Sequence, residues 1–130
     1  MAERLTADDF FTGLFATLAL KGRSTFTLRS THFDEAVAEA YHALLERAAE
    51  EGVDVRFRIF LHPIYGESSG IRDSVTRAAQ RDIVSFRNPE YQEIDLKLNQ
   101  ESARLFLEGL PGTPELYRTL ADRFLTSYQA

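Results

Sequence analysis

The segment Val53–Leu61 constrains the fold more than any other part of the chain, because apolar and polar side chains alternate along it. The two sides of an extended strand would carry Val53, Val55, Phe57, Ile59 and Leu61 on one face and Asp54, Arg56, Arg58 and Phe60 on the other. Alternation with a period of two is typical of a strand that is buried on one side only. A parallel strand covered on both faces would be apolar throughout. The sequence therefore predicts a sheet with one apolar face and one charged face, and the charged face must meet water or a partner.

The composition fits one compact domain spanning residues 1–130, with 44% apolar and 27% charged residues. The net charge of -5 argues against bulk attraction to nucleic acid, although it leaves a local basic patch open. The chain has no cysteine, which excludes disulfides and thiolate zinc sites and is compatible with the reducing cytosol. We therefore expect a cytoplasmic protein.

The apolar segment Phe10–Leu20 is too short to cross a bilayer as a helix. It is preceded by Glu3, Asp8 and Asp9, where a signal peptide would carry positive charge. We expect no export signal, no membrane span and no membrane partner.

Cap residues predict where the helices begin. Thr6 with Asp9 and Thr31 with Asp34 have the spacing of a capping box, with an acid in place of Glu or Gln. Gly22 and Gly52 would end the two helices that follow. A shorter helix is expected from Ile71, a fourth after Asn99 and a fifth after Thr113, where a cap is followed by Pro114 and Glu115.

Four strands are expected between the helices, at Thr25–Arg29, Val53–Leu61, Asp82–Arg87 and Tyr91–Leu98. The first three are joined through helices, which favours parallel crossovers, whereas the last two flank a short connection typical of a hairpin. The resulting order, α-β-α-β-α-β-β-α-α, predicts an α/β (two-layer α+β) domain. It would have one mixed four-stranded sheet and helices mainly on one face.

The exposed sheet face is the first candidate binding surface. We expect Arg56, Arg58, Phe60, Tyr91 and Glu93 to form an interface there, because arginine beside aromatic rings is favoured at protein contacts. Its partner would be another protein, a second copy of the chain or, less favoured by the charge, a nucleic-acid strand. A solvated face on which Glu93 and Asp95 pair with the two arginines is the alternative. The last two helices offer a second docking surface if the sheet leaves part of their apolar side uncovered.

The segment Gly66–Gly70 matches the G-x-S-x-G pattern of serine hydrolases. In those enzymes the serine lies on a sharp turn directly between strand and helix, whereas here four residues, His62–Tyr65, follow the strand. Anion binding suits this loop better, because the backbone amides of a helix start would point into it. We expect His62, Ser68, Ser69, Gly70 and Arg72 to bind a phosphate, a carboxylate or a nucleotide if the loop is a ligand site.

Acidic residues on the last two expected strands form the third candidate. Asp82, followed on the next strand by Glu93, Asp95 and Lys97, resembles the PD-(D/E)xK nuclease pattern. The resemblance implies acids that hold a divalent metal and a lysine that assists the attacking water. Arg81 stands where the proline of that pattern would be, and strand parity would place Asp82 on the opposite face from Asp95 and Lys97.

No histidine pair has the spacing of metal ligands, so we expect neither a metal site nor a cofactor. The sequence favours a non-enzymatic interaction module, a small acidic subunit, regulator or inhibitor. A small-ligand domain using the 62–72 loop and a metal-dependent nuclease are the alternatives.

Overall fold

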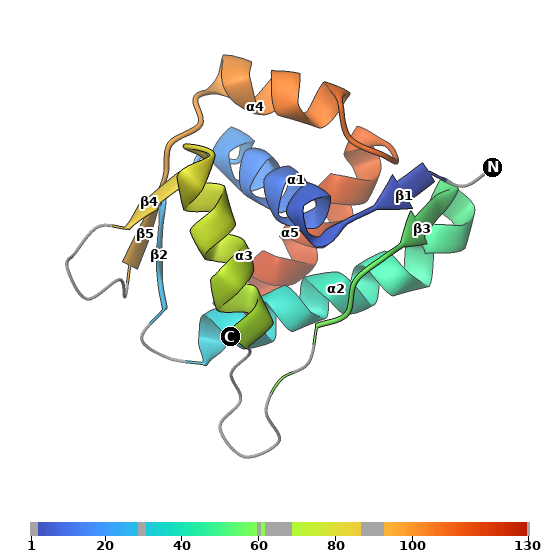
Figure 1. The fold of residues 1–130 in the computed structure, drawn as a ribbon, viewed down its shortest axis with the longest axis horizontal. Helices are drawn as coiled ribbons and strands as arrows, with labels where there is room; N and C mark the ends of the chain where they lie inside the picture. Colours follow the sequence, from blue (N-terminus) through green and yellow to red (C-terminus); the bar gives the residue numbers. More distant parts are fainter. Residues whose placement is uncertain (1–2, 29–30, 60, 62–68, 87–92, 130) are drawn as a thin grey trace.

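The computed structural model describes residues 3–28, 31–59, 61, 69–86 and 93–129. In that part of the chain, helices dominate a mixed α/β structure, and the predicted fold class is confirmed (Figure 1). The helices are α1 (Ala7–Leu20), α2 (His32–Glu51), α3 (Ser69–Gln80), α4 (Gln100–Glu108) and α5 (Pro114–Tyr128). The strands are β1 (Glu3–Leu5), β2 (Thr25–Thr27), β3 (Val53–Val55), β4 (Val84–Phe86) and β5 (Glu93–Leu96).

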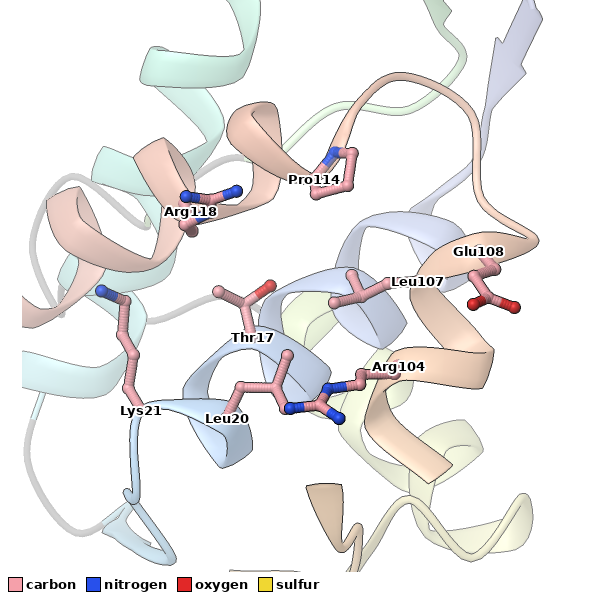
Figure 2. A pocket seen from close by; sticks show the side chains of 8 residues that line it. All are labelled: Thr17, Leu20, Lys21, Arg104, Leu107, Glu108, Pro114 and Arg118. Carbon is pink, nitrogen blue, oxygen red and sulfur yellow. The ribbon is translucent and has the colours of Figure 1, made fainter. Parts of the chain in front are cut away.

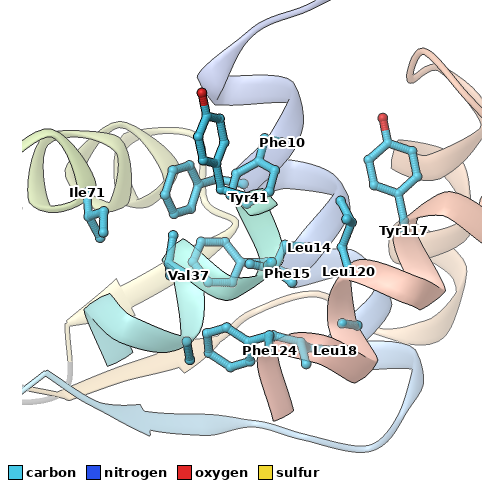
Figure 3. Packing of buried hydrophobic residues seen from close by; sticks show 14 of the residues in the cluster. Phe10, Leu14, Phe15, Leu18, Val37, Tyr41, Ile71, Tyr117, Leu120 and Phe124 are labelled. Carbon is cyan, nitrogen blue, oxygen red and sulfur yellow. The ribbon is translucent and has the colours of Figure 1, made fainter. Parts of the chain in front are cut away.

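Helix α1 lies at the centre of the molecule, and the other helices surround it (Figure 1). Its buried side chains point in several directions rather than along one face, which is the pattern of a helix inside a core. Figure 3 shows Phe10, Leu14 and Phe15 of α1 packed among side chains of α2 and α5. The core is thus organised around a helix and not around one face of a sheet.

Three of the predicted helix starts are confirmed by their hydrogen bonds. Thr6 and Asp9 form a reciprocal capping box, in which the Asp9 amide donates to Thr6 Oγ1 over 3.2 Å and the Thr6 amide donates to Asp9 Oδ2 over 3.1 Å. Asn99 and Thr113 cap α4 and α5 through their side chains. These bonds satisfy amides that the first turn of a helix leaves without a partner.

The predicted capping box at Thr31 is wrong. Thr31 has a helical backbone and makes no side-chain cap hydrogen bond; its hydroxyl donates instead to Glu35. Asp34 is fully buried and faces Arg72 of α3. Its Oδ2 atom lies 3.5 Å from the guanidinium of Arg72 and so faces α3.

The prediction of a single four-stranded sheet is wrong in strand number and order. β1 and β3 form a parallel pair, and β2, β5 and β4 form a separate antiparallel sheet with β5 in the middle. The antiparallel pairing of β4 with β5 agrees with the predicted hairpin, whose connection lies outside the described residues. The two sheets lie at opposite ends of the helical core (Figure 1).

Strand β3 ends after three residues because its partner ends. β1 pairs Leu5 with Val55, the Arg56 amide donates to the Leu5 carbonyl, and the chain then enters α1. Beyond that point the extended segment lies on the helices. Phe57 and Ile59 are half-buried against the core, and the Tyr41 hydroxyl donates to the Phe57 carbonyl over 3.0 Å. For the described residues of this segment, which leave out Phe60, the predicted inward and outward sides are therefore correct, although its expected length as a strand is not.

Among the residues that the structure describes, no helix combines the length and the apolar character needed to span a membrane.

Candidate functional site

The predicted anion loop lies only in part within the described chain. His62 and Ser68 are outside it, and Ser69 and Gly70 form the first turn of α3. The guanidinium of Arg72 donates to the Leu28 carbonyl over 2.9 Å and lies 3.5 Å from Oδ2 of Asp34. Because these contacts tie α3 to the end of β2 and to α2, Arg72 supports the fold, whatever the loop binds.

The predicted nuclease residues are not arranged as the alternation of side chains along two regular strands implied. Asp82 precedes β4 in a left-handed conformation, with a φ of 60°, so strand parity does not govern its side chain. Its carboxylate lies 3.5 Å from the ammonium of Lys97, whereas Asp95 accepts a hydrogen bond of 2.7 Å from Thr25. Among the described residues, no group of three or more His, Cys, Asp or Glu side chains could hold a metal ion.

The predicted interface residues do not share one sheet face. Arg56 and Arg58 follow β3 in one sheet, while Glu93 belongs to β5 in the other. Both arginines are exposed, and Arg56 pairs with its neighbour Asp54 over 2.8 Å. Phe60 and Tyr91 lie outside the described residues. The proposed pairing of these arginines with Glu93 and Asp95 across adjacent strands is therefore wrong, because β3 is not adjacent to β5.

A cavity of about 480 Å³ lies between α1, α4 and α5 (Figure 2). Its apolar lining comes from Leu20 of α1, Leu107 of α4 and Pro114 at the start of α5. Natural small-molecule sites are concave, mostly apolar and roughly 300–1,000 Å³ in volume. The cavity therefore has the size and the lining of a ligand site.

Cations outnumber acids among the residues that line this cavity, although the chain as a whole is acidic. Lys21, Arg104 and Arg118 line it with a single acid, Glu108. In Figure 2, Lys21 and Arg118 lie on one side and Arg104 and Glu108 on the other. A cavity with apolar walls and cations at its edge is suited to an anion that carries an apolar body.

The three cations differ in how they are paired. Lys21 lies 2.7 Å from Asp122, and Arg118 lies 3.0 Å from Glu115; both acids are well exposed. Exposed ion pairs of this kind contribute little to stability, so either cation can leave its acid for another anion. Within the described chain, Arg104 makes neither an ion pair nor a hydrogen bond, and its guanidinium points toward Leu20 (Figure 2). Arg104 is thus the cation most available to an anion.

One buried polar group beside the cavity has no hydrogen-bond partner among the described residues. Thr17 is 2% exposed, and its Oγ1 forms no hydrogen bond to any described residue. Thr17 lines the cavity together with Leu20 and Leu107 (Figure 2). Because Oγ1 of Thr17 is inaccessible to solvent, this hydroxyl belongs to the packed core beneath the cavity wall, as the Oγ1 of Thr12 does elsewhere on α1.

Sequence reasoning missed this site, although its parts follow helical spacing. Thr17, Leu20 and Lys21 are spaced i, i+3, i+4 at the end of α1, where Lys21 is the C-cap residue, and Arg104, Leu107 and Glu108 repeat that spacing on α4. Such spacing places each set on one face of its helix. What the sequence did not indicate is that the two faces, far apart in the chain, meet across a gap. For the last two helices, the expectation was a docking surface for a partner, on the condition that the sheet leaves part of their apolar side uncovered.

A scan against protein-family models and searches of curated proteins and of solved structures find no match to this chain.

Proposed function

We propose that this protein is a small-molecule-binding domain whose ligand is an amphipathic anion, an aliphatic chain ending in a carboxylate or a phosphate. The observation that carries the proposal is the cavity of about 480 Å³ between α1, α4 and α5, with an apolar interior and cations at its edge. Apolar walls favour the aliphatic part through burial, and Arg104 supplies a charged donor for the anionic end.

The cavity supports a small ligand more strongly than the sheet face supports a docking partner. The arginines and the acid expected to form one charged face lie on two separate sheets, so that surface lacks the continuity it was expected to have. Docking of another protein, or of a second copy, stays a prediction for the exposed parts of the last two helices.

Calorimetric titration of the full chain with decanoate, decyl phosphate and the uncharged decanol tests the proposal. We expect saturable binding of at least one anion, weaker binding of decanol, and a rise in melting temperature with the anion that binds. Failure of both anions to bind below their micelle concentrations would remove the proposal. The relative affinities of decanoate and decyl phosphate distinguish the two headgroups.

A variant that fills the cavity tests the location of the site, and a variant with the same substitution on the surface is its matched control. Leu20 lines the cavity and is only half-buried, so Leu20→Trp should occupy the space with little disturbance of the core and abolish binding. Leu105 lies on α4, is 62% exposed and does not line the cavity, so Leu105→Trp should bind as the unmodified chain does. Equal loss of binding in both variants would contradict the location of the site.

A further inference from the structure

The cations that line the cavity between α1, α4 and α5 are divided between two of its sides. Arg104 of α4 lies on one side together with Glu108, and its guanidinium makes no ion pair or hydrogen bond within the described chain (Figure 2). Lys21, at the end of α1, and Arg118 of α5 lie on the other side (Figure 2). A ligand with a single anionic end can use the cations of only one side.

Lys21 and Arg118 keep donors for a ligand although each already contacts an acid. The ammonium of Lys21 lies 2.7 Å from Oδ1 of Asp122, and one terminal nitrogen of Arg118 lies 3.0 Å from Oε1 of Glu115. An ammonium has three donors and a guanidinium has five, so neither contact uses all of them. Neither of these two acids lines the cavity. A carboxylate inside the cavity can therefore bind both cations without replacing an acid there.

Resting on the function proposed above, we infer that the ligand carries an anionic group at each end of its aliphatic chain, with one end bound by Arg104 and the other by Lys21 and Arg118. The ligand class is then an α,ω-dicarboxylate rather than a fatty acid. Its methylene groups would be buried against the apolar lining, while each carboxylate stays at the cavity edge beside a cation. A fatty acid would instead bring its methyl end to the second group of cations.

Paired titrations of the unmodified full chain test this inference. Calorimetry compares each even-numbered dicarboxylate from octanedioate to tetradecanedioate with the monocarboxylate of the same carbon count. At a site with cations on one side only, exchanging a methyl end for a carboxylate would weaken binding, because a charge is costly to bury. We expect one dicarboxylate to bind about fivefold more tightly than its monocarboxylate. This affinity ratio should be highest at a single chain length, since only that length reaches both groups of cations.

A double variant locates the second anionic end. Lys21→Gln combined with Arg118→Gln should reduce the affinity ratio at the preferred chain length to within about twofold. Arg56→Gln combined with Arg58→Gln is the matched control, because it removes the same charge from two exposed arginines that do not line this cavity. The control should keep the ratio. Equal reductions in the two double variants would show that long-range attraction of a doubly charged ligand accounts for the preference, and would contradict the inference.

The outcomes separate this inference from the proposal on which it rests. If monocarboxylates bind but no dicarboxylate binds more tightly, or if the affinity ratio is the same at every chain length, the second anionic end is wrong while the binding site stands. Because this comparison uses the unmodified chain, the decision does not depend on the folding of any variant. If neither class of acid binds, the proposed function itself fails.

Discussion

The aromatic ring of Tyr117 in α5 lies directly against the backbone of Gly13 in α1. A methyl group at Gly13 would overlap the ring carbons Cδ1 and Cε1 of Tyr117, and Leu110 lies close to the same point. Tyr117 is fully buried, and its hydroxyl donates to the Pro111 carbonyl over 2.5 Å. The absence of a side chain at Gly13 therefore sets how closely the first and last helices approach.

Substituting Gly13 should destabilise the protein, although alanine is ordinarily the better residue inside a helix. We expect Gly13→Ala to lower the free energy of unfolding by about 1–2 kcal/mol, because an overpacking cost of up to about 3 kcal/mol outweighs the roughly 1 kcal/mol gained in helix propensity. Urea denaturation followed by circular dichroism measures the change. Gly109→Ala is the matched control, since a methyl group there would meet only the Phe106 carbonyl oxygen at 3.9 Å. Equal stability of Gly13→Ala and the unmodified chain would contradict the close approach.

The contact between Arg72 and Asp34 predicts a second effect on stability. Removing the guanidinium in Arg72→Leu takes a donor away from the Leu28 carbonyl and a counter-charge away from a fully buried carboxylate. We expect a loss of about 1–3 kcal/mol in the free energy of unfolding, measured by the same denaturation. Arg56→Leu removes an arginine whose pair with Asp54 is half exposed on both sides, and should change stability by less than about 1 kcal/mol. Similar losses in the two variants would show that burial of Asp34 does not govern the effect.

Local signals predicted the helices well and the sheets poorly, and the difference has a physical origin. A capping box such as Thr6 with Asp9 is made by neighbours in the sequence, so the sequence contains all of it. A strand needs a partner from elsewhere in the chain. β1 spans only Glu3–Leu5, too short for any periodic signal, yet it decides where β3 stops.

The candidate site was beyond sequence reasoning for a related reason. The position of Arg104 near Leu20 follows from how α4 packs on α1, and neither residue belongs to a recognisable motif. Ser69 and Gly70 belong to a G-x-S-x-G motif, so the sequence drew attention to that loop and not to the cavity. Polar residues within the apolar segment Phe10–Leu20 do not single out the site either, because Thr12 and Thr17 are both buried there and only Thr17 lines the cavity.

Tyr117 predicts a loss of stability at high pH. Burial, and then the nearby negative charges of Asp9, Glu3 and Glu51, raise the pKa of the Tyr117 phenol above its ordinary value. In the unfolded chain this phenol loses its proton near pH 10, while in the folded chain it keeps it. The native state therefore binds more protons above about pH 10, and its stability falls as the pH rises through that range.

The variant Tyr117→Phe separates the effect of the Tyr117 phenol on the pH dependence of stability from the effects of other titratable groups. At about pH 8 we expect the variant to be less stable by roughly 1 kcal/mol, because the Pro111 carbonyl loses its donor. As the pH rises above about 10, the stability gap between the two proteins should narrow, since only the unmodified chain must keep a buried phenol protonated. Denaturation curves recorded at several pH values measure the gap, and a constant gap would show that Tyr117 does not govern the pH dependence.

Arg104 should determine the affinity for the anionic end of the ligand. Replacing it in Arg104→Gln removes the charge but keeps polar, hydrogen-bonding character, and we expect affinity for the anion that binds to fall about tenfold, with little change for decanol. The unmodified chain should also bind the anion more weakly as salt is raised, and the variant should lose part of that dependence. Arg56→Gln changes an exposed arginine that does not line the cavity, and it controls for the change in net charge. If Arg56→Gln weakened binding as much as Arg104→Gln does, long-range attraction and not a contact in the cavity would account for the preference for anions.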